Sequence, residues 1–171
     1  KIIPRKYVYS SNSYRSRIDE KYTNINSYTS VVDDFLKANF NDTPTDICFL
    51  GVKLGTSRKQ LLQSLGIPKA TITVSSKHDL QVLYYKKSFA KQRARIEFHF
   101  YRKKLFYIHV RLSRVNAVIR KDLYAVLKKK YGVIHSSKDL GYKNHNGHTL
   151  MINDNLNFNL NYFLLDAEFL K

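Results

Sequence analysis

The sequence predicts an α+β fold, in which an antiparallel sheet has helices packed on one of its faces. Segments that alternate apolar and polar residues, as half-buried strands do, occur in runs. Two of these runs each follow a segment that has helix start and stop signals. The 171 residues, 43% of them hydrophobic, are enough for one domain with its own core.

Three helices are expected. A short one lies near residues 30–40, where Ser30 provides an N-cap. The second begins after Ser57, which has capping-box spacing to Gln60, and it ends at Gly66. The longest begins after Asn116. Its expected apolar face consists of Val118, Ile119, Leu123, Val126 and Leu127.

The expected strands are residues 47–52, 71–75, 80–85, 95–101, 105–112, 149–152 and 156–162. The first 28 residues have no clean apolar period, which favours a linker or a loosely docked tail with one short strand at residues 6–9. The predicted organisation is therefore an N-terminal appendage, residues 1–46, followed by a single α+β domain, residues 47–171.

An internal duplication is one interpretation of the order of helices and strands. A shift of about 62 residues lays residues 58–61 on residues 120–123, and it also lays the apolar positions of residues 96–100 on those of residues 158–162. The two units would be residues 47–112 and 113–171, each a helix followed by a β-meander.

The second predicted helix belongs to a recognisable motif. Residues 50–68 read LGVKLGTSRKQLLQSLGIP. This segment resembles the opening motif of SmpA/OmlA-type (BamE-like) envelope lipoproteins, and it is similar to that of β-lactamase-inhibitor-protein-like domains. The resemblance implies a helix followed by antiparallel strands, and a non-enzymatic envelope or secreted protein that binds other proteins through its sheet. The chain departs from the lipoprotein pattern because its single cysteine, Cys48, is internal.

The net charge of +17 is concentrated in the middle of the chain. Residues 51–130 hold 20 Lys and Arg against three Asp and Glu, whereas both flanking regions are close to neutral. Such a region attracts polyanions, including nucleic acid, anionic lipid and acidic protein surfaces. The alternative is that the charge only keeps the protein soluble.

The predicted hairpin of residues 95–112 places basic and aromatic side chains on one face. If residues 102–104 form a three-residue loop, Tyr101 pairs with Leu105 and Arg95 lies opposite Arg111, a like-charge pair that an acidic partner would relieve. The same register keeps the apolar residues of both strands together. The candidate partner-binding residues, with two lysines that precede the hairpin, are Lys86, Lys87, Arg95, His99, Tyr101, Tyr107, His109 and Arg111.

No catalytic, cofactor-binding or metal-binding residues are predicted. The chain contains no nucleophile elbow, Walker A or dinucleotide-binding motif. His135, His145 and His148 match no zinc-ligand spacing, and Cys48 lies in an apolar run that favours a buried thiol.

The sequence therefore predicts a binding or accessory protein that holds an acidic macromolecule, with a protein surface favoured over nucleic acid. The resemblance favours the bacterial envelope or the secreted space over the cytoplasm. Nucleic-acid binding through residues 51–130 is the alternative. No stretch reaches the length of a membrane-spanning helix.

Overall fold

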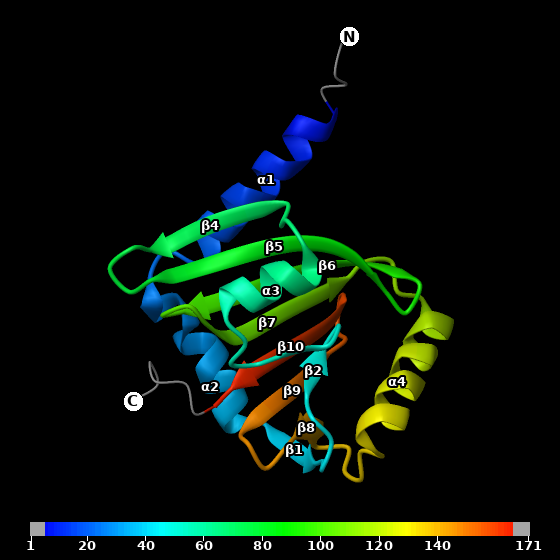
Figure 1. Cartoon of the computed structure of the whole chain (residues 1–171). Coiled ribbons are helices and arrows are strands. Elements are labelled where there is room, and N and C mark those ends of the chain that lie inside the picture. Colours follow the sequence, from blue (N-terminus) through cyan, green and yellow to red (C-terminus); the bar gives the residue numbers. More distant parts are fainter. Residues whose placement is uncertain (1–5, 166–171) are drawn as a thin grey trace.

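A single eight-stranded sheet is the centre of the fold (Figure 1). The computed structural model describes the backbone of residues 6–165 and the side chains of residues 14–165, so residues 166–171 of the predicted domain lie outside it. The strands run in the order β1-β8-β9-β10-β7-β6-β5-β4, and all neighbours are antiparallel except β1 and β8. The predicted α+β fold with an antiparallel sheet is confirmed.

The sheet strands are β1 (Asn39–Asp42), β4 (Ala70–Ser75), β5 (Leu80–Phe89), β6 (Gln92–Tyr101), β7 (Lys104–Leu112), β8 (Asp139–Lys143), β9 (His148–Asn153) and β10 (Phe158–Leu164). A separate small hairpin consists of β2 (Cys48–Phe49) and β3 (Val52–Lys53). The helices are α1 (Lys6–Lys21), η1 (Ile25–Tyr28), α2 (Thr29–Lys37), α3 (Arg58–Leu65) and α4 (Ala117–Tyr131). None of these described helices is long and apolar enough to cross a membrane.

Helices α3 and α4 cover one face of the sheet. The Ser57 side chain accepts a hydrogen bond from the backbone of Gln60, and Gly66 ends α3 with a φ of 77°, as predicted. Asn116 likewise caps α4. Leu61 of α3 is buried in this core with Leu123, Leu127 and Tyr131 of α4. The prediction that Val118 and Val126 face the core is wrong, because they are 68% and 46% exposed.

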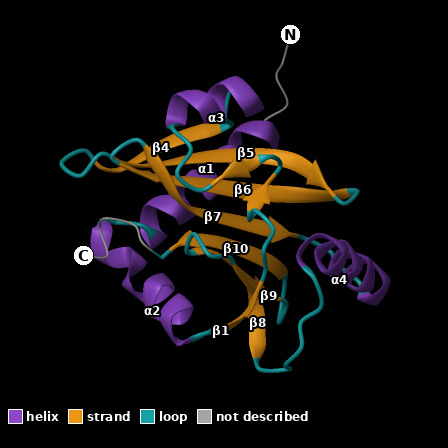
Figure 2. Ribbon diagram, turned by 60° about the horizontal axis from the view of Figure 1, so that its bottom comes forward, coloured by secondary structure: helices purple, strands orange, loops and turns teal. Residues whose placement is uncertain are grey.

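The N-terminal segment, which contains α1, η1 and α2, covers the opposite face; α3 and α4 of the predicted domain share one face as expected, but the predicted appendage adds helices on the other (Figure 2). Ile18, Tyr22, Tyr28 and Phe35 are each at most 2% exposed and pack against side chains of β4, β5, β7 and β10. Burial of such side chains contributes about 1.5–3 kcal/mol each. The first part of the chain is therefore integral to the fold.

Local structure in the N-terminal segment also differs from the prediction. Residues 6–9 belong to α1 and form no strand. The predicted short helix exists as α2, but its N-cap position is Tyr28 and no side chain caps it. The capping box lies earlier, between Asn24 and Ser27 at η1. Strand β1 then pairs with β8, which ties this segment to the far edge of the sheet.

The β6–β7 turn is shorter than predicted. Arg102 and Lys103 alone form the loop, with φ values of 46° and 64°, so Tyr101 pairs with Lys104 and not with Leu105. A bulge between His99 and Phe100 restores the predicted register for the rest of the hairpin. As a consequence, Phe106 points into the core under the N-terminal segment, whereas simple alternation along the strand would place it on the other face with Ile108 and Val110.

The order of a helix followed by a meander occurs twice. Helix α3 precedes β4–β7 and α4 precedes β8–β10, and the last strands of the two meanders, β7 and β10, pair side by side. The apolar positions of β6 and β10 matched by the 62-residue shift all lie in the core under α3 and α4. Duplication stays a prediction, and if it occurred its two products share one sheet.

Candidate functional site

The central hairpin, β6–β7, has the predicted pairing from Arg95 to His99, but the N-terminal segment covers much of its polar face. Arg95 lies opposite Arg111, Glu97 opposite His109 and His99 opposite Tyr107. His99 is 0% exposed and Tyr107 is 2% exposed, because the N-terminal segment lies over them. These two residues are therefore not available to a partner, and their assignment to a solvent-facing surface is wrong.

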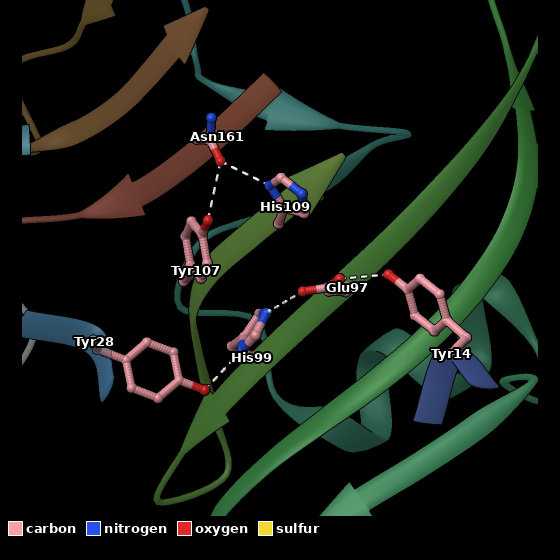
Figure 3. Close-up of polar contacts among 7 residues, drawn as sticks. All are labelled: Tyr14, Tyr28, Glu97, His99, Tyr107, His109 and Asn161. Atoms are coloured by element: carbon pink, nitrogen blue, oxygen red, sulfur yellow. Dashed lines mark hydrogen bonds and ion pairs between the residues drawn. The ribbon is translucent and has the colours of Figure 1, made fainter. Parts of the chain in front are cut away.

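A chain of polar contacts replaces solvent around Glu97 and His99 (Figure 3). The Tyr14 hydroxyl donates to Glu97 Oε1, and His99 Nε2 lies 3.3 Å from Glu97 Oε2. The Tyr28 hydroxyl lies 2.8 Å from His99 Nδ1. Because a carboxylate only accepts hydrogen bonds, Nε2 carries the proton of the neutral imidazole and Nδ1 accepts from Tyr28. Strand β6 thus supplies the carboxylate and the imidazole, and the N-terminal segment supplies both hydroxyl groups.

A second polar group lies beside the first, between β7 and β10. The Tyr107 hydroxyl donates to Asn161 Oδ1 at 2.9 Å, and His109 Nδ1 lies 2.8 Å from the same oxygen. Since this oxygen accepts, Nδ1 of His109 is the protonated nitrogen. His109 is half-buried in this arrangement.

Burial and hydrogen bonding set the charge states of these groups. Burial raises the pKa of Glu97, but the hydrogen bond from His99, the nearby His109 and the hydrogen bond from Tyr14 outweigh burial and lower it to about 2. Burial lowers the pKa of His99 to about 4, against the opposing effect of Glu97. Burial also lowers the pKa of His109. At neutral pH the cluster is one carboxylate between neutral imidazoles.

The order of hydroxyl, imidazole and carboxylate in Tyr28, His99 and Glu97 is that of an acyl-transfer triad. Its setting does not suit catalysis. Tyr28 is 1% exposed, burial raises its pKa, and it lines none of the described hollows. A satisfied buried network of this kind fixes the N-terminal segment on the sheet.

The other candidate residues reach the surface. Tyr101 and Arg111 are half-buried, and the Arg102 guanidinium lies 5.2 Å from the centre of the Tyr101 ring. Lys86 and Lys87 are exposed on β5, and Arg95 is half-buried on β6 opposite Lys86. The guanidinium of Arg95 lies 5.7 Å from the centre of the Tyr14 ring.

Lys86, Lys87 and Arg95 share a hollow of about 900 Å³, which we call the basic hollow. It lies where the β5–β6 hairpin extends past the end of β7, beside the connection to α4 (Figure 1). Its lining residues are Lys86, Lys87, Ser88, Lys91, Gln92, Arg93, Ala94, Arg95, Ser113 and Arg114. The candidate residues chosen from the sequence do not include Lys91, Arg93 and Arg114, although Lys91 and Arg93 belong to the same basic run as Arg95.

Six Lys and Arg residues line the basic hollow and, among the described residues, no acidic one does; Lys87 alternates with Lys86 along β5 and directs its ammonium toward the other face of the sheet. Lys86 and Arg95 are direct neighbours across β5 and β6, and Arg111 follows across β7. Within the part of the chain that the structure describes, no ion pair involves a cation of the hollow. The Lys87 ammonium does donate to the Leu65 carbonyl at 3.1 Å. Like charges this close repel, so an anion bound here would be stabilised.

The structure also describes the surroundings of Cys48 and of the side chains that could bind a metal ion. Cys48 is half-buried, not fully buried as expected, and its Sγ lies 3.3 Å from the Lys130 ammonium. No group of three His, Cys, Asp or Glu side chains among the described residues could hold a metal ion.

Comparison with known proteins yields no match to this chain among protein-family models, curated proteins or solved structures.

Proposed function

We propose that this chain is a non-enzymatic binding protein that holds an acidic partner, in the first place an acidic protein surface, at the basic hollow. The observation that carries this proposal is the charge of the hollow, six Lys and Arg residues with no carboxylate among its described lining residues. Arg and Lys side chains in this arrangement recognise acidic segments by charge-assisted hydrogen bonds.

The burial of the aromatic residues favours a protein partner over nucleic acid. Single-stranded nucleic acid is held by basic grooves in which bases stack on exposed aromatic rings. Of the candidate residues with aromatic side chains, His99 and Tyr107 are covered, and Tyr101, which reaches the surface, lies at the other end of β6 from the basic hollow. Among the residues whose side chains the structure describes, no aromatic one lines the basic hollow. Nucleic acid would therefore be held only through its phosphates, without a surface for its bases.

The resemblance of residues 50–68 to envelope proteins supports action in the bacterial envelope or the secreted space. Fractionation of cells that express the complete gene tests this part of the proposal. Recovery of the protein only in the cytosolic fraction would contradict it.

Fluorescence anisotropy tests the choice of partner. Labelled probes would be an acidic peptide of about twelve Glu residues, single- and double-stranded DNA, and RNA, each over a salt series that includes about 0.15 M. We expect the peptide to bind at that salt concentration and the nucleic acids to dissociate. Tight nucleic-acid binding at about 0.15 M with a steep salt dependence would replace the proposal with the nucleic-acid alternative.

Paired charge-removal variants locate the binding. Lys86 and Arg93 are exposed lining residues of the hollow, whereas Lys128 and Lys129 are exposed at the end of α4. The double change Lys86→Gln with Arg93→Gln should weaken peptide binding more than Lys128→Gln with Lys129→Gln, which removes the same charge. Equal effects of the two variants would show that only the net charge matters, and the basic hollow would lose its role.

A further inference from the structure

The basic hollow is small for a macromolecular interface and highly charged for its size. Its volume of about 900 Å³ lies in the range of small-molecule sites, roughly 300–1,000 Å³. A protein segment in this volume presents few carboxylates, because each residue carries at most one charge. Lys and Arg residues around such a space therefore suit a group that holds several negative charges close together.

The functional groups of the lining residues indicate the class of ligand more closely. Arg93, Arg95 and Arg114 present guanidinium groups, whose planar forks bind phosphate oxygens in pairs. Lys86 and Lys91 add compact positive charges. Ser88 and Ser113 add hydroxyl groups that can donate to anionic oxygens.

The backbone holds two of these cations in an unusual conformation. Lys91, in the β5–β6 turn, has a φ of 62°, and Arg114, after β7, has a φ of 61°. Residues other than Gly pay roughly 1–2 kcal/mol for this left-handed conformation. Both residues line the basic hollow from separate connections. Arg102 and Lys103 adopt the same conformation outside the hollow, so it shows where the backbone places Lys91 and Arg114 and does not by itself indicate a ligand.

We propose that the basic hollow binds a compact phosphorylated group with two or more phosphoryl units, either free or carried by the acidic partner. This inference rests on the proposed function, because it names the chemistry of the group that enters the same site. The absence of aromatic side chains from the lining means that recognition is of the phosphoryl groups, not of a base or another ring attached to them.

Calorimetric titration of the full chain tests the proposal at about 0.15 M salt. The probes are inorganic triphosphate, a peptide with two adjacent phosphoserines, the same peptide with Glu at both positions, and citrate as a compact tricarboxylate. We expect triphosphate to bind at one site, and the phosphopeptide at least tenfold more tightly than its Glu counterpart. Citrate should bind no more tightly than the Glu peptide.

The variant pair described above places the site. Lys86→Gln with Arg93→Gln should weaken triphosphate binding by about a hundredfold or more, since each lost charge-assisted hydrogen bond weakens it by about tenfold or more. Lys128→Gln with Lys129→Gln should leave it within about twofold. Circular dichroism and thermal unfolding verify that both variants fold, which is expected because all four side chains are exposed. Equal weakening in both variants would overturn the assignment to the hollow.

The four probes distinguish a failure of the phosphoryl inference from a failure of the proposed function. Binding of triphosphate alone identifies a free ligand, and binding of both triphosphate and the phosphopeptide identifies a phosphorylated partner. If the Glu peptide binds as tightly as the phosphopeptide, the phosphoryl inference is wrong and the proposed function stands. If no probe binds, both are wrong.

Discussion

Acidification should destabilise this protein through His99, which is buried in the neutral state. Burial lowers its pKa to about 4 from the ordinary histidine value of 6.5. Between these two values the unfolded chain binds a proton that the folded protein excludes, so the free energy of unfolding falls as the pH falls from 6.5 to 4. One such group lowers that free energy by about 3 kcal/mol over the window. This is a large fraction of the roughly 5–15 kcal/mol that stabilises a typical domain.

Glu97 extends the effect to lower pH. Its pKa is about 2 in the folded protein against an ordinary glutamate value of 4.5, so its contribution to stability is complete above pH 4.5 and is lost as the pH falls toward 2. The two residues therefore act in the same direction in successive windows. His109 adds to the first window, because burial lowers its pKa too.

Urea unfolding followed by circular dichroism measures this dependence. With a slope of about 2 kcal/mol per molar urea, the loss from His99 alone moves the midpoint down by about 1.5 M between about pH 7 and about pH 4. His99→Gln is the control, because Gln retains an amide donor for Glu97 and does not titrate. This variant should be less stable at neutral pH and show a flatter dependence below pH 6.5. Parallel curves for the two proteins would refute the argument that His99 is held neutral.

Three further predictions concern named side chains. Tyr14→Phe removes a donor to the buried carboxylate but keeps the ring, so it should lower the free energy of unfolding by about 1–3 kcal/mol in urea titrations and leave triphosphate binding unchanged. Lys103 has a φ of 64° in the β6–β7 turn, so Lys103→Gly should raise the free energy of unfolding by up to about 1 kcal/mol. Lys91→Gly should raise the free energy of unfolding by a similar amount, but it should also weaken triphosphate binding in calorimetry. Leu127→Ala should lower the free energy of unfolding, measured in urea, by about 2–5 kcal/mol. Val118→Ala on the same helix should change that free energy by less than about 0.5 kcal/mol. Similar losses of stability in both variants would contradict the orientation of α4.

Local signals in the sequence predicted most of the second half of the fold. Helices α3 and α4 carry their own caps and stops, and the apolar alternation of β6 and β7 determines which residues face each other. The turn between β6 and β7 is harder to predict, because Arg102 and Lys103 occupy left-handed positions that Gly and Asn usually take. The sequence gives no local sign of such a strained turn.

The sequence does not predict that the N-terminal segment packs on the sheet, because its apolar residues are few and mostly aromatic. Tyr14, Ile18 and Tyr22 recur at every fourth position, which is the helical spacing that could have predicted α1. Surrounding Ser, Asn and Arg residues obscure this stripe. The sequence does not predict where α1 packs, because the alternation of residues in β6 shows only that Glu97 and His99 lie on the same face of the strand. Polar residues on a strand face are usually solvated, and here long-range packing covers them.

Coverage of the central hairpin by the N-terminal segment decides where a partner can bind. The candidate residues that reach the surface then lie at the two ends of β6, with Tyr101 near the β6–β7 turn and Arg95 at the basic hollow, where selection depends on charge and on the geometry of Lys and Arg side chains. Tyr14 links the basic hollow to the buried network, because its ring lies under the Arg95 guanidinium and its hydroxyl donates to Glu97. A ligand that holds Arg95 in place would also hold Tyr14 and α1 against the sheet. Ligand binding should therefore stabilise the whole fold, in proportion to the logarithm of the ligand concentration over its dissociation constant.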